Sequence, residues 1–234
     1  MVGDILLSVG AKNWDAHVVH AEEVARGEGF RALRDHIIEA AGPVRGETCV
    51  DIGAGTGLLT LPIASVGVYV WAVDISPAMR EYLRAKASSA GLDDVHAVVG
   101  SAVSLPLVDA CADVVVSNYC FHHLSDVDKR RTLAEVRRVL RPGGRLVFAD
   151  MMFRLSVARR RDRQVLRDKV RGMVRKGPAG VRRLVKNALR IISRRWEQPA
   201  DAQWWRDALL EAGFHDISVE ELHHEGGIAT ARKP

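Results

Sequence analysis

The stretch Val50-Asp-Ile-Gly-Ala-Gly-Thr-Gly-Leu58 decides the fold of this chain. It closes a short apolar run, Thr48 to Ile52, and leads into an apolar segment, Leu58 to Ser65, that we interpret as a helix. Glycines between a strand and a helix let the backbone turn sharply and approach a ligand closely. The first turn of such a helix offers free N–H groups to a carboxylate or a phosphate.

An acidic residue stands at the end of the next predicted strand. Tyr69 to Val73 is typical of a buried strand, and Asp74 follows it, 21 residues after Gly53. A carboxylate in this place can accept hydrogen bonds from both ribose hydroxyls of an adenosine-containing ligand. Ser76-Pro77 then predicts the start of a helix, with an N-cap and a proline in the first turn. A tight turn without any ligand is the alternative interpretation.

Apolar runs and helical segments alternate along the rest of the chain. Strands are predicted at Val95 to Val99, Asp113 to Ser117, Arg145 to Phe148, Ile217 to Leu222 and Gly227 to Ala231, and helices at Asp126 to Leu140 and Asp201 to Ala212. Nearly continuous apolar strands separated by helices indicate a parallel sheet covered on both faces, which right-handed crossovers make doubly wound. We therefore predict one α/β domain over residues 1–234, preceded by a helical segment at 12–41.

The composition is that of an ordinary globular protein. Of 234 residues, 47% are hydrophobic and 27% are charged, which disfavours disorder. No apolar run approaches the roughly 20 residues that span a bilayer, and we predict no signal peptide. Three cysteines without CxxC spacing disfavour a disulfide framework and a metal site. A reducing cytoplasm fits best.

Positive charge gathers in one segment. Residues 154–195 hold sixteen Lys and Arg against two acids, a local charge of +14, which leaves −9 for the rest of a chain whose total is +5. The pattern predicts two basic amphipathic helices, at 156–176 and 179–195, within an insertion over 154–198. Three interpretations stay open: peripheral contact with an anionic membrane, binding of RNA phosphates, and a solvated cover whose arginines pair with the acidic body.

Three motifs carry a family resemblance. Val50 to Leu59 resembles motif I of the class I S-adenosylmethionine (SAM) dependent methyltransferases, and its glycine spacing departs from the G-x-G-x-x-G of dinucleotide enzymes. Ala72 to Met79 resembles the segment after their second strand, and Leu133 to Leu146 the helix and turn before their fifth. The chain is most similar to the type 11 subgroup, which resembles ubiquinone and menaquinone biosynthesis methyltransferases. The resemblance covers residues 45–153 and, more loosely, 201–234.

The resemblance implies a Rossmann-like sheet of seven strands with the last one antiparallel. It also implies that the helices at 12–41 form a lid and that the basic insertion follows the fifth strand. The expected cofactor is SAM, with S-adenosylhomocysteine as its product. Residues implied to hold the methionine portion are Asp51, Gly53, Ala54, Gly55, Thr56 and Gly57.

The remaining part of the cofactor is assigned in the same way. Asp74 is expected to bind the ribose, and Ile75 and Met79 to pack on the adenine. Ser101 and Ala102 stand where the family usually has an acid facing the adenine amine, so Ser101 departs from the pattern, although its hydroxyl can still accept a hydrogen bond. Asn118 and Tyr119 are expected to close over the sulfonium.

Methyl transfer requires a positioned nucleophile and, where that nucleophile carries a proton, a base. The candidates beyond the strand ends are Tyr119, His122, His123 and Asp150. A histidine titrates near neutral pH and suits a base. The alternative is that one histidine packs near SAM and the other caps the next helix, and adjacent histidines are expected to point in different directions. Asp150 fits a base, an orienting group or a strand-end cap equally well.

In the N-terminal segment, Trp14, His17 and His20 share one helical face, which suits either a lid or a solvated surface. The function we predict is methyl transfer from SAM to a small or lipid-like acceptor, with O- or C-methylation favoured over N-methylation. The alternatives are an RNA methyltransferase that uses the basic insertion and a SAM-binding protein without turnover. The expected location is the cytoplasm, with membrane association through 154–195 left open.

Overall fold

The computed structural model describes residues 13–153, 198–222 and 225–234, together with eight positions between 163 and 177. The described strands form one sheet of seven, in the order β3-β2-β1-β4-β5-β7-β6. They are β1 (Thr48–Ile52), β2 (Tyr69–Asp74), β3 (Val95–Val99), β4 (Ala112–Asn118), β5 (Leu140–Met151), β6 (His215–Glu221) and β7 (Gly226–Arg232).

The sheet is parallel except for its last strand. Strands β1 to β5 pair in parallel, and β7 is antiparallel to both of its neighbours, β5 and β6. The chain order reverses between β1 and β4, and in open α/β sheets ligands bind beyond the carboxyl ends of the strands at such a switch point. The predicted doubly wound sheet with an antiparallel last strand is confirmed.

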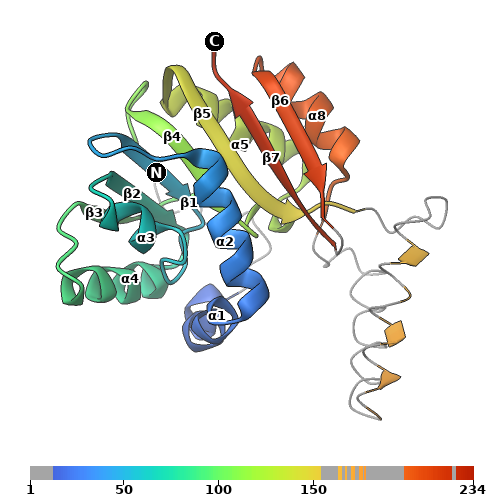
Figure 1. Ribbon diagram of the computed structural model, residues 1–234, viewed down its shortest axis with the longest axis horizontal. Coiled ribbons are helices and arrows are strands. Elements are labelled where there is room, and N and C mark those ends of the chain that lie inside the picture. The colour runs from blue at the N-terminus through green and yellow to red at the C-terminus, as the bar shows by residue number, and fades with distance from the viewer. Residues whose placement is uncertain are drawn as a thin grey trace.

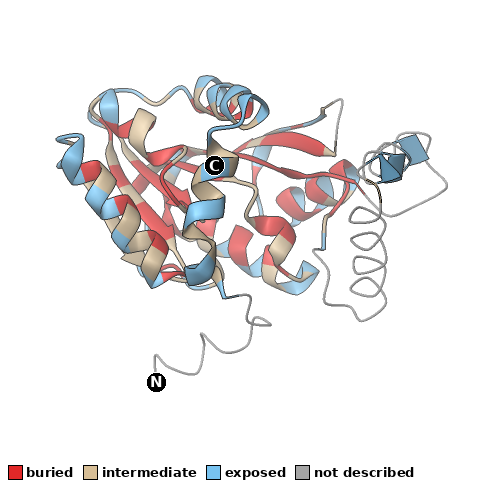
Figure 2. Ribbon diagram, turned by 90° about the horizontal axis from the view of Figure 1, so that it is seen from below, coloured by how far each residue is buried: buried red, intermediate tan, exposed pale blue. Residues whose placement is uncertain are grey.

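Helices cover both faces of the sheet (Figure 1). On one face lie α2 (Glu28–Ala41), which packs on β4 and β5, and α3 (Thr60–Ser65) and α4 (Pro77–Ser89), which pack on β2 and β3. On the other lie α5 (Asp126–Val139) and α8 (Ala202–Glu211). Figure 2 shows the buried sheet enclosed between helices whose outer faces are exposed. The central strands are therefore apolar on both sides, as the continuous runs predict.

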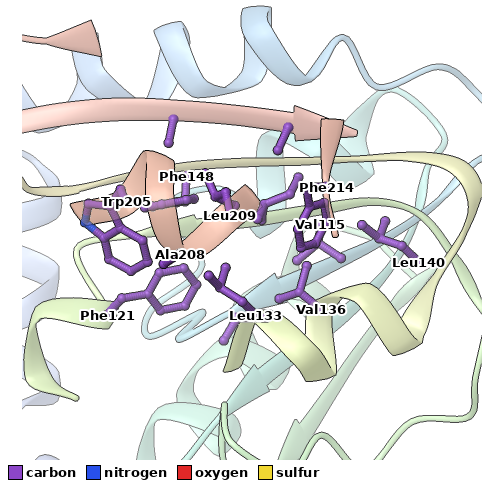
Figure 3. Close-up of a cluster of buried hydrophobic side chains, with 14 of the residues drawn as sticks. Val115, Phe121, Leu133, Val136, Leu140, Phe148, Trp205, Ala208, Leu209 and Phe214 are labelled. Atoms are coloured by element: carbon purple, nitrogen blue, oxygen red, sulfur yellow. The ribbon is translucent and has the colours of Figure 1, made fainter. Parts of the chain in front are cut away.

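The larger core cluster holds the turn that carries the histidine pair (Figure 3). The Phe121 ring, 1% exposed, lies 5.1 Å from the Phe148 ring and 5.9 Å from the Trp205 ring. Phe121 begins the short 3-10 helix η3 (Phe121–His123). Because truncation of a buried Phe costs about 3–5 kcal/mol, this anchor fixes where the following two residues stand.

The N-terminal segment is broken where one helical stretch is predicted over 12–41. A 3-10 turn, η2 (Trp14–His17), leads into α1 (Val18–Ala25), and α2 begins at Glu28. Gly27 has an extended backbone between them (φ −63°, ψ 140°), which a helix cannot include. In Figure 1, α1 lies below the end of α2, beside the carboxyl ends of the strands.

The starts of α3 and β5 differ from the sequence prediction. Helix α3 begins at Thr60 and not at Leu58, because the residues of the glycine loop continue as turns up to Leu59. Strand β5 begins at Leu140 and not at Arg145. Residues 141–144, between the predicted helix and strand, form an irregularity in the pairing of β5 with β4: Gly143 has φ +75°, and Gly143 and Gly144 exchange backbone hydrogen bonds with Lys233 at 2.9 Å.

The described positions of the basic insertion from 163 to 174 are helical, which agrees with the first predicted helix there. The second, at 179–195, and the apolar start of the chain lie outside the described residues. Within the part of the chain that the structure describes, no helix has both the length and the apolar character needed to cross a membrane.

Candidate active site

A cavity of about 380 Å³ lies beyond the carboxyl ends of β1, β2 and β4. The glycine loop and Asp74 form one wall, the turn after β4 forms another, and residues of η2, α1 and α2 cover it. Residues that are up to 110 positions apart in sequence, from Trp14 to Leu124, thus line one cavity at the switch point of the sheet. This volume is ordinary for a small-molecule site.

The glycine loop can adopt its path only with glycine at two positions. Gly53 has φ +72°, and a Cβ there would lie 2.5 Å from the Cys120 Sγ, so β1 and β4 approach each other through this residue. Gly57 has φ +88°, and a Cβ there would lie 2.4 Å from a methyl of Leu83 in α4. Gly53 lines the cavity, whereas Gly57 lies outside its lining and serves the packing of the loop on α4.

Asp74 ties the loop to the second strand. One carboxylate oxygen accepts the Gly55 N–H at 2.8 Å, and the other accepts the Ser76 N–H at 2.9 Å. Burial raises the pKa of Asp74, and these two backbone donors oppose that rise. A carboxylate has about four lone-pair positions, so both oxygens keep one for a ligand hydroxyl at the cavity wall. The residue thus shapes the loop and still presents acceptors to the cavity.

Asp51 is buried at the base of the cavity. Its Oδ2 accepts the Thr60 hydroxyl at 2.6 Å, and the residue is 2% exposed. Burial raises the pKa of Asp51 to about 7. A cationic group in the cavity would favour the ionised form of this carboxyl, which suits the ammonium of a methionine-like ligand.

The other expected cofactor residues line the same cavity. They are Ala54, Gly55, Thr56, Ile75, Met79, Ser101, Ala102 and Asn118. The Asn118 Oδ1 is buried and has no hydrogen-bond partner among the described residues. Because such an atom costs free energy unless a ligand or water satisfies it, Asn118 points to a polar or cationic group bound here. The Ser101 hydroxyl has only a long contact, 3.4 Å, from the Val103 N–H.

The N-terminal segment closes over the cavity and is fastened to α4 at two places. The Asp15 carboxylate accepts the Ser76 hydroxyl at 2.5 Å and the Ala78 N–H at 3.2 Å. The Lys86 ammonium donates to Glu22 at 3.0 Å and to the Thr56 carbonyl at 3.1 Å, which joins the cover to the glycine loop.

The rings of this cover face the cavity. Trp14, His17 and His20 line it, and the Trp14 ring lies 4.7 Å from the His123 ring. Phe30 of α2 also lines it and lies 5.2 Å from the Tyr119 ring. The placement of the partly buried Trp14 and His17 favours the lid interpretation, whereas the His20 side chain is 72% exposed, as the solvated-surface interpretation expects.

A buried histidine–carboxylate pair lies at the acceptor side. The His122 Nδ1 is 2.6 Å from the Asp150 Oδ1, and the His122 N–H donates to Oδ2 of the same carboxylate at 3.0 Å. Their side chains are 5% and 1% exposed. His122 lines the cavity and Asp150 does not. Asp150 therefore orients His122, and Nε2 is the ring nitrogen left for a ligand.

Both histidines face the same space, contrary to the expectation that adjacent side chains diverge. Their rings are 3.9 Å apart at 51°, because the tight turn η3 brings successive residues onto one wall. Tyr119 precedes them with φ +52°, a left-handed conformation that is uncommon for a bulky residue. Its ring lies 5.8 Å from His122, and burial raises the pKa of its phenol well above the usual range. Such strain is typical of functional sites.

Sequence reasoning did not find several lining residues. Phe30 belongs to the apolar pattern of the N-terminal helices, but no local signal separates a lid residue from a core residue. Cys120 is another, and burial raises the pKa of its thiol far above the ordinary value. Asp15, Glu22 and Lys86 were also missed, because their partners are more than 60 residues away in sequence.

A doubly wound sheet of this order, a glycine loop and an acid after the second strand define the class I SAM-dependent methyltransferases. Residues 50–148 match a family described as a methyltransferase domain. An uncharacterized methyltransferase of Anoxybacillus flavithermus is 30% identical over 145 residues, 61% of this chain and 64% of that protein. The uncharacterized methyltransferase YrrT of Bacillus subtilis is 33% identical, over 61% and 66%. The matched region thus spans slightly less than two thirds of these relatives.

Solved structures share the fold. A SAM-dependent methyltransferase from Aquifex aeolicus superposes with a TM-score of 0.61 at 20% identity, over 86% of this chain and 89% of that one. The chain resembles the class I methyltransferases of the type 11 group, both in the match over residues 50–148 and in its fold. The cofactor of this class is SAM, and the cavity fits it: Asp51 faces the space for a cation, Asp74 offers acceptors, and Asn118 has an unsatisfied oxygen.

Proposed function

We propose that this protein transfers a methyl group from SAM to a small or lipid-like acceptor, and that His122 removes the acceptor's proton. The observation that carries the proposal is that His122, held by the buried Asp150, lines the same cavity as the glycine loop and Asp74. An imidazole oriented by a buried carboxylate is a suitable base near neutral pH.

The cofactor supplies an electrophilic methyl group on a sulfonium, with an already good leaving group. In the proposed role, the Asp150 carboxylate accepts the Nδ1–H and leaves the Nε2 lone pair for the acceptor. SAM, held by the glycine loop, Asp51 and Asp74, would supply the methyl group to the acceptor oxygen or carbon and would be left as S-adenosylhomocysteine. The acceptor's proton passes to Nε2, and Asp150 stabilises the imidazolium that results.

The described residues that line the cavity support an uncharged acceptor. They include seven ring side chains and no Lys or Arg; the rings belong to Trp14, His17, His20, Phe30, Tyr119, His122 and His123. The two acids, Asp51 and Asp74, both lie at the cofactor wall. A flat or apolar molecule with a hydroxyl or an acidic C–H fits such a surface, which favours O- or C-methylation.

The test uses methyl-labelled SAM, purified protein and a cell extract, with the label partitioned between organic solvent, aqueous small molecules, RNA and protein. We expect label in small or solvent-extractable molecules with the wild type and little with His122→Ala. Label in RNA would refute the acceptor class. Full transfer by His122→Ala would refute the base.

For the partner of the basic insertion, we propose an anionic membrane surface. Arg163, Arg167, Arg171 and Arg175 recur at four-residue intervals and are exposed, as are Val170 and Val174 beside them. Arginines next to apolar side chains suit lipid headgroups and the acyl boundary. We expect the protein to sediment with phosphatidylglycerol vesicles and not with phosphatidylcholine vesicles. Binding to RNA alone would contradict this.

A further inference from the structure

The buried ammonium of Lys129 joins the start of α5 to Gln198, close to His122. Lys129 of α5 has a side chain that is 0% exposed. Its Nζ donates to the Leu124 carbonyl at 3.0 Å, to Asp126 Oδ1 at 3.0 Å and to the Gln198 carbonyl at 2.5 Å. An ammonium has three N–H donors, so each has an acceptor: two lie at the start of α5 and the third is Gln198. Burial of a lysine is costly without such partners, which indicates that the arrangement is specific.

Gln198 connects this ammonium to His122. The Gln198 N–H donates to the His122 carbonyl at 2.7 Å, while the Gln198 carbonyl accepts from Lys129. The His122 N–H and imidazole are held by Asp150. Every polar group of His122 except Nε2 therefore has a partner, and its carbonyl depends on Gln198.

The same contacts tie the basic insertion to the pair. Before the insertion, β5 ends at Met151, directly after Asp150. At its other end, Gln198, the last residue of the insertion, donates its N–H to the His122 carbonyl. Both ends of the segment 154–198 therefore adjoin the His122–Asp150 pair, one through the carboxylate and the other through Gln198 and Lys129.

We propose that Lys129 is a positioning residue for His122: it fixes the return of the insertion at Gln198 and thereby sets the orientation of the imidazole. The proposal rests on the proposed role of His122 as base. Lys129 does not line the cavity, so it acts through His122 and not on the acceptor. Two hydrogen bonds connect Lys129 to His122: Lys129 donates to the Gln198 carbonyl, and the Gln198 N–H donates to the His122 carbonyl.

The alternative is that Lys129 only stabilises the fold. Lys233 offers a matched comparison, because its Nζ also donates to a backbone carbonyl, that of Leu140 at 2.6 Å. Leu140 lies at the other end of β5 from Asp150. Lys233→Met therefore removes the same kind of hydrogen bond far from the His122–Asp150 pair.

The experiment records the imidazole nitrogen and carbon signals of ¹³C,¹⁵N-histidine-labelled full-length protein with saturating S-adenosylhomocysteine. The His122 signals are assigned with His122→Gln. In the wild type we expect one tautomer, with the proton on Nδ1. In Lys129→Met and in Gln198→Pro, which lacks the N–H, we expect shifted or doubled His122 signals and a mixture of tautomers, with unaltered affinity for S-adenosylhomocysteine. Lys233→Met should leave the signals in place.

Wild-type His122 signals in folded Lys129→Met and Gln198→Pro would overturn the proposal. If Lys129→Met does not fold, Gln198→Pro decides alone, because it keeps the lysine. The readout needs no acceptor and no turnover. Full methyl transfer by His122→Gln would refute the role of His122 as base. Refutation of the Lys129 role would be seen only in the spectra, so the two failures are distinguishable.

Discussion

Replacement of Asp74 by alanine tests the cofactor site most directly. The carboxylate accepts the Gly55 and Ser76 N–H groups at 2.8 and 2.9 Å, and it offers its remaining lone pairs to the ribose. Hydrogen bonds to a charged group contribute about 1.5–3 kcal/mol each, and the partly accessible cavity wall reduces the cost of leaving a donor unpaired. We expect Asp74→Ala to weaken binding by about 1–3 kcal/mol, roughly five- to 150-fold in Kd.

Replacement of Asp74 should also change the stability of the ligand-free protein. Since Asp74 also holds the loop, the ligand-free variant should lose about 1–2 kcal/mol of stability. For a domain of this size, that is a fall of about 2–8 °C in Tm. The exposed acid Asp93, in the turn before β3, provides the control Asp93→Ala, which should change neither quantity.

The assay is titration calorimetry with S-adenosylhomocysteine, accompanied by thermal unfolding with and without the ligand. A wild-type Kd in Asp74→Ala would refute the ribose assignment. A weakened Kd with an unchanged Tm would retain the assignment and refute the role of Asp74 in holding the loop.

Three further predictions follow from the site. Burial raises the pKa of Asp51 to about 7, against 3.8 without burial, so the folded ligand-free protein binds a proton that the unfolded chain has released. Its stability should therefore fall as the pH rises from 4 to 7, by up to ~1.4 kcal/mol per pH unit, and urea unfolding should show a flatter profile for Asp51→Asn; parallel profiles would contradict this. Asp150→Asn should lower methyl transfer by about 10²–10⁴-fold, because His122 loses its orienting carboxylate, with unaltered affinity for S-adenosylhomocysteine; a wild-type rate would remove Asp150 from the mechanism. Lys86→Met should speed release of S-adenosylhomocysteine by roughly two- to tenfold in stopped-flow experiments, because the ion pair with Glu22 that fastens the lid is lost. The wild-type rate should also rise with salt, and equal rates at all salt concentrations would show that this pair does not fasten the lid.

Local patterns were sufficient to predict the seven strands along the chain. Val50 to Leu58 combines a buried strand, a glycine turn and the approach to a helix, and Asp74 falls one strand later. Each of these signals depends only on residues that are neighbours in sequence. They can therefore be identified without knowledge of the fold. Element boundaries were less predictable: Leu140 belongs to β5 because it pairs with Ala112 of β4, and Lys233 pairs with Gly143 and Gly144, contacts that are distant in sequence.

The cofactor wall was predictable because its residues follow the ends of neighbouring parallel strands. The exception is Gly57, which the run of glycines places in the site and the structure places against Leu83 of α4. The acceptor wall was not predictable to the same extent. His122 and Asp150 are 28 residues apart, and only the adjacent ends of β4 and β5 bring them to 2.6 Å.

By itself, the sequence determined the class of the fold, the glycine loop and the acid of the cofactor site, because periodicity, turn residues and spacing act over short stretches of chain. The tertiary structure decided which candidates touch one another. It brought His122 and Asp150 into contact, placed both histidines on one cavity, and joined Lys129 to Gln198 across 69 residues. Those relations depend on the distance between side chains in space, which no local pattern records.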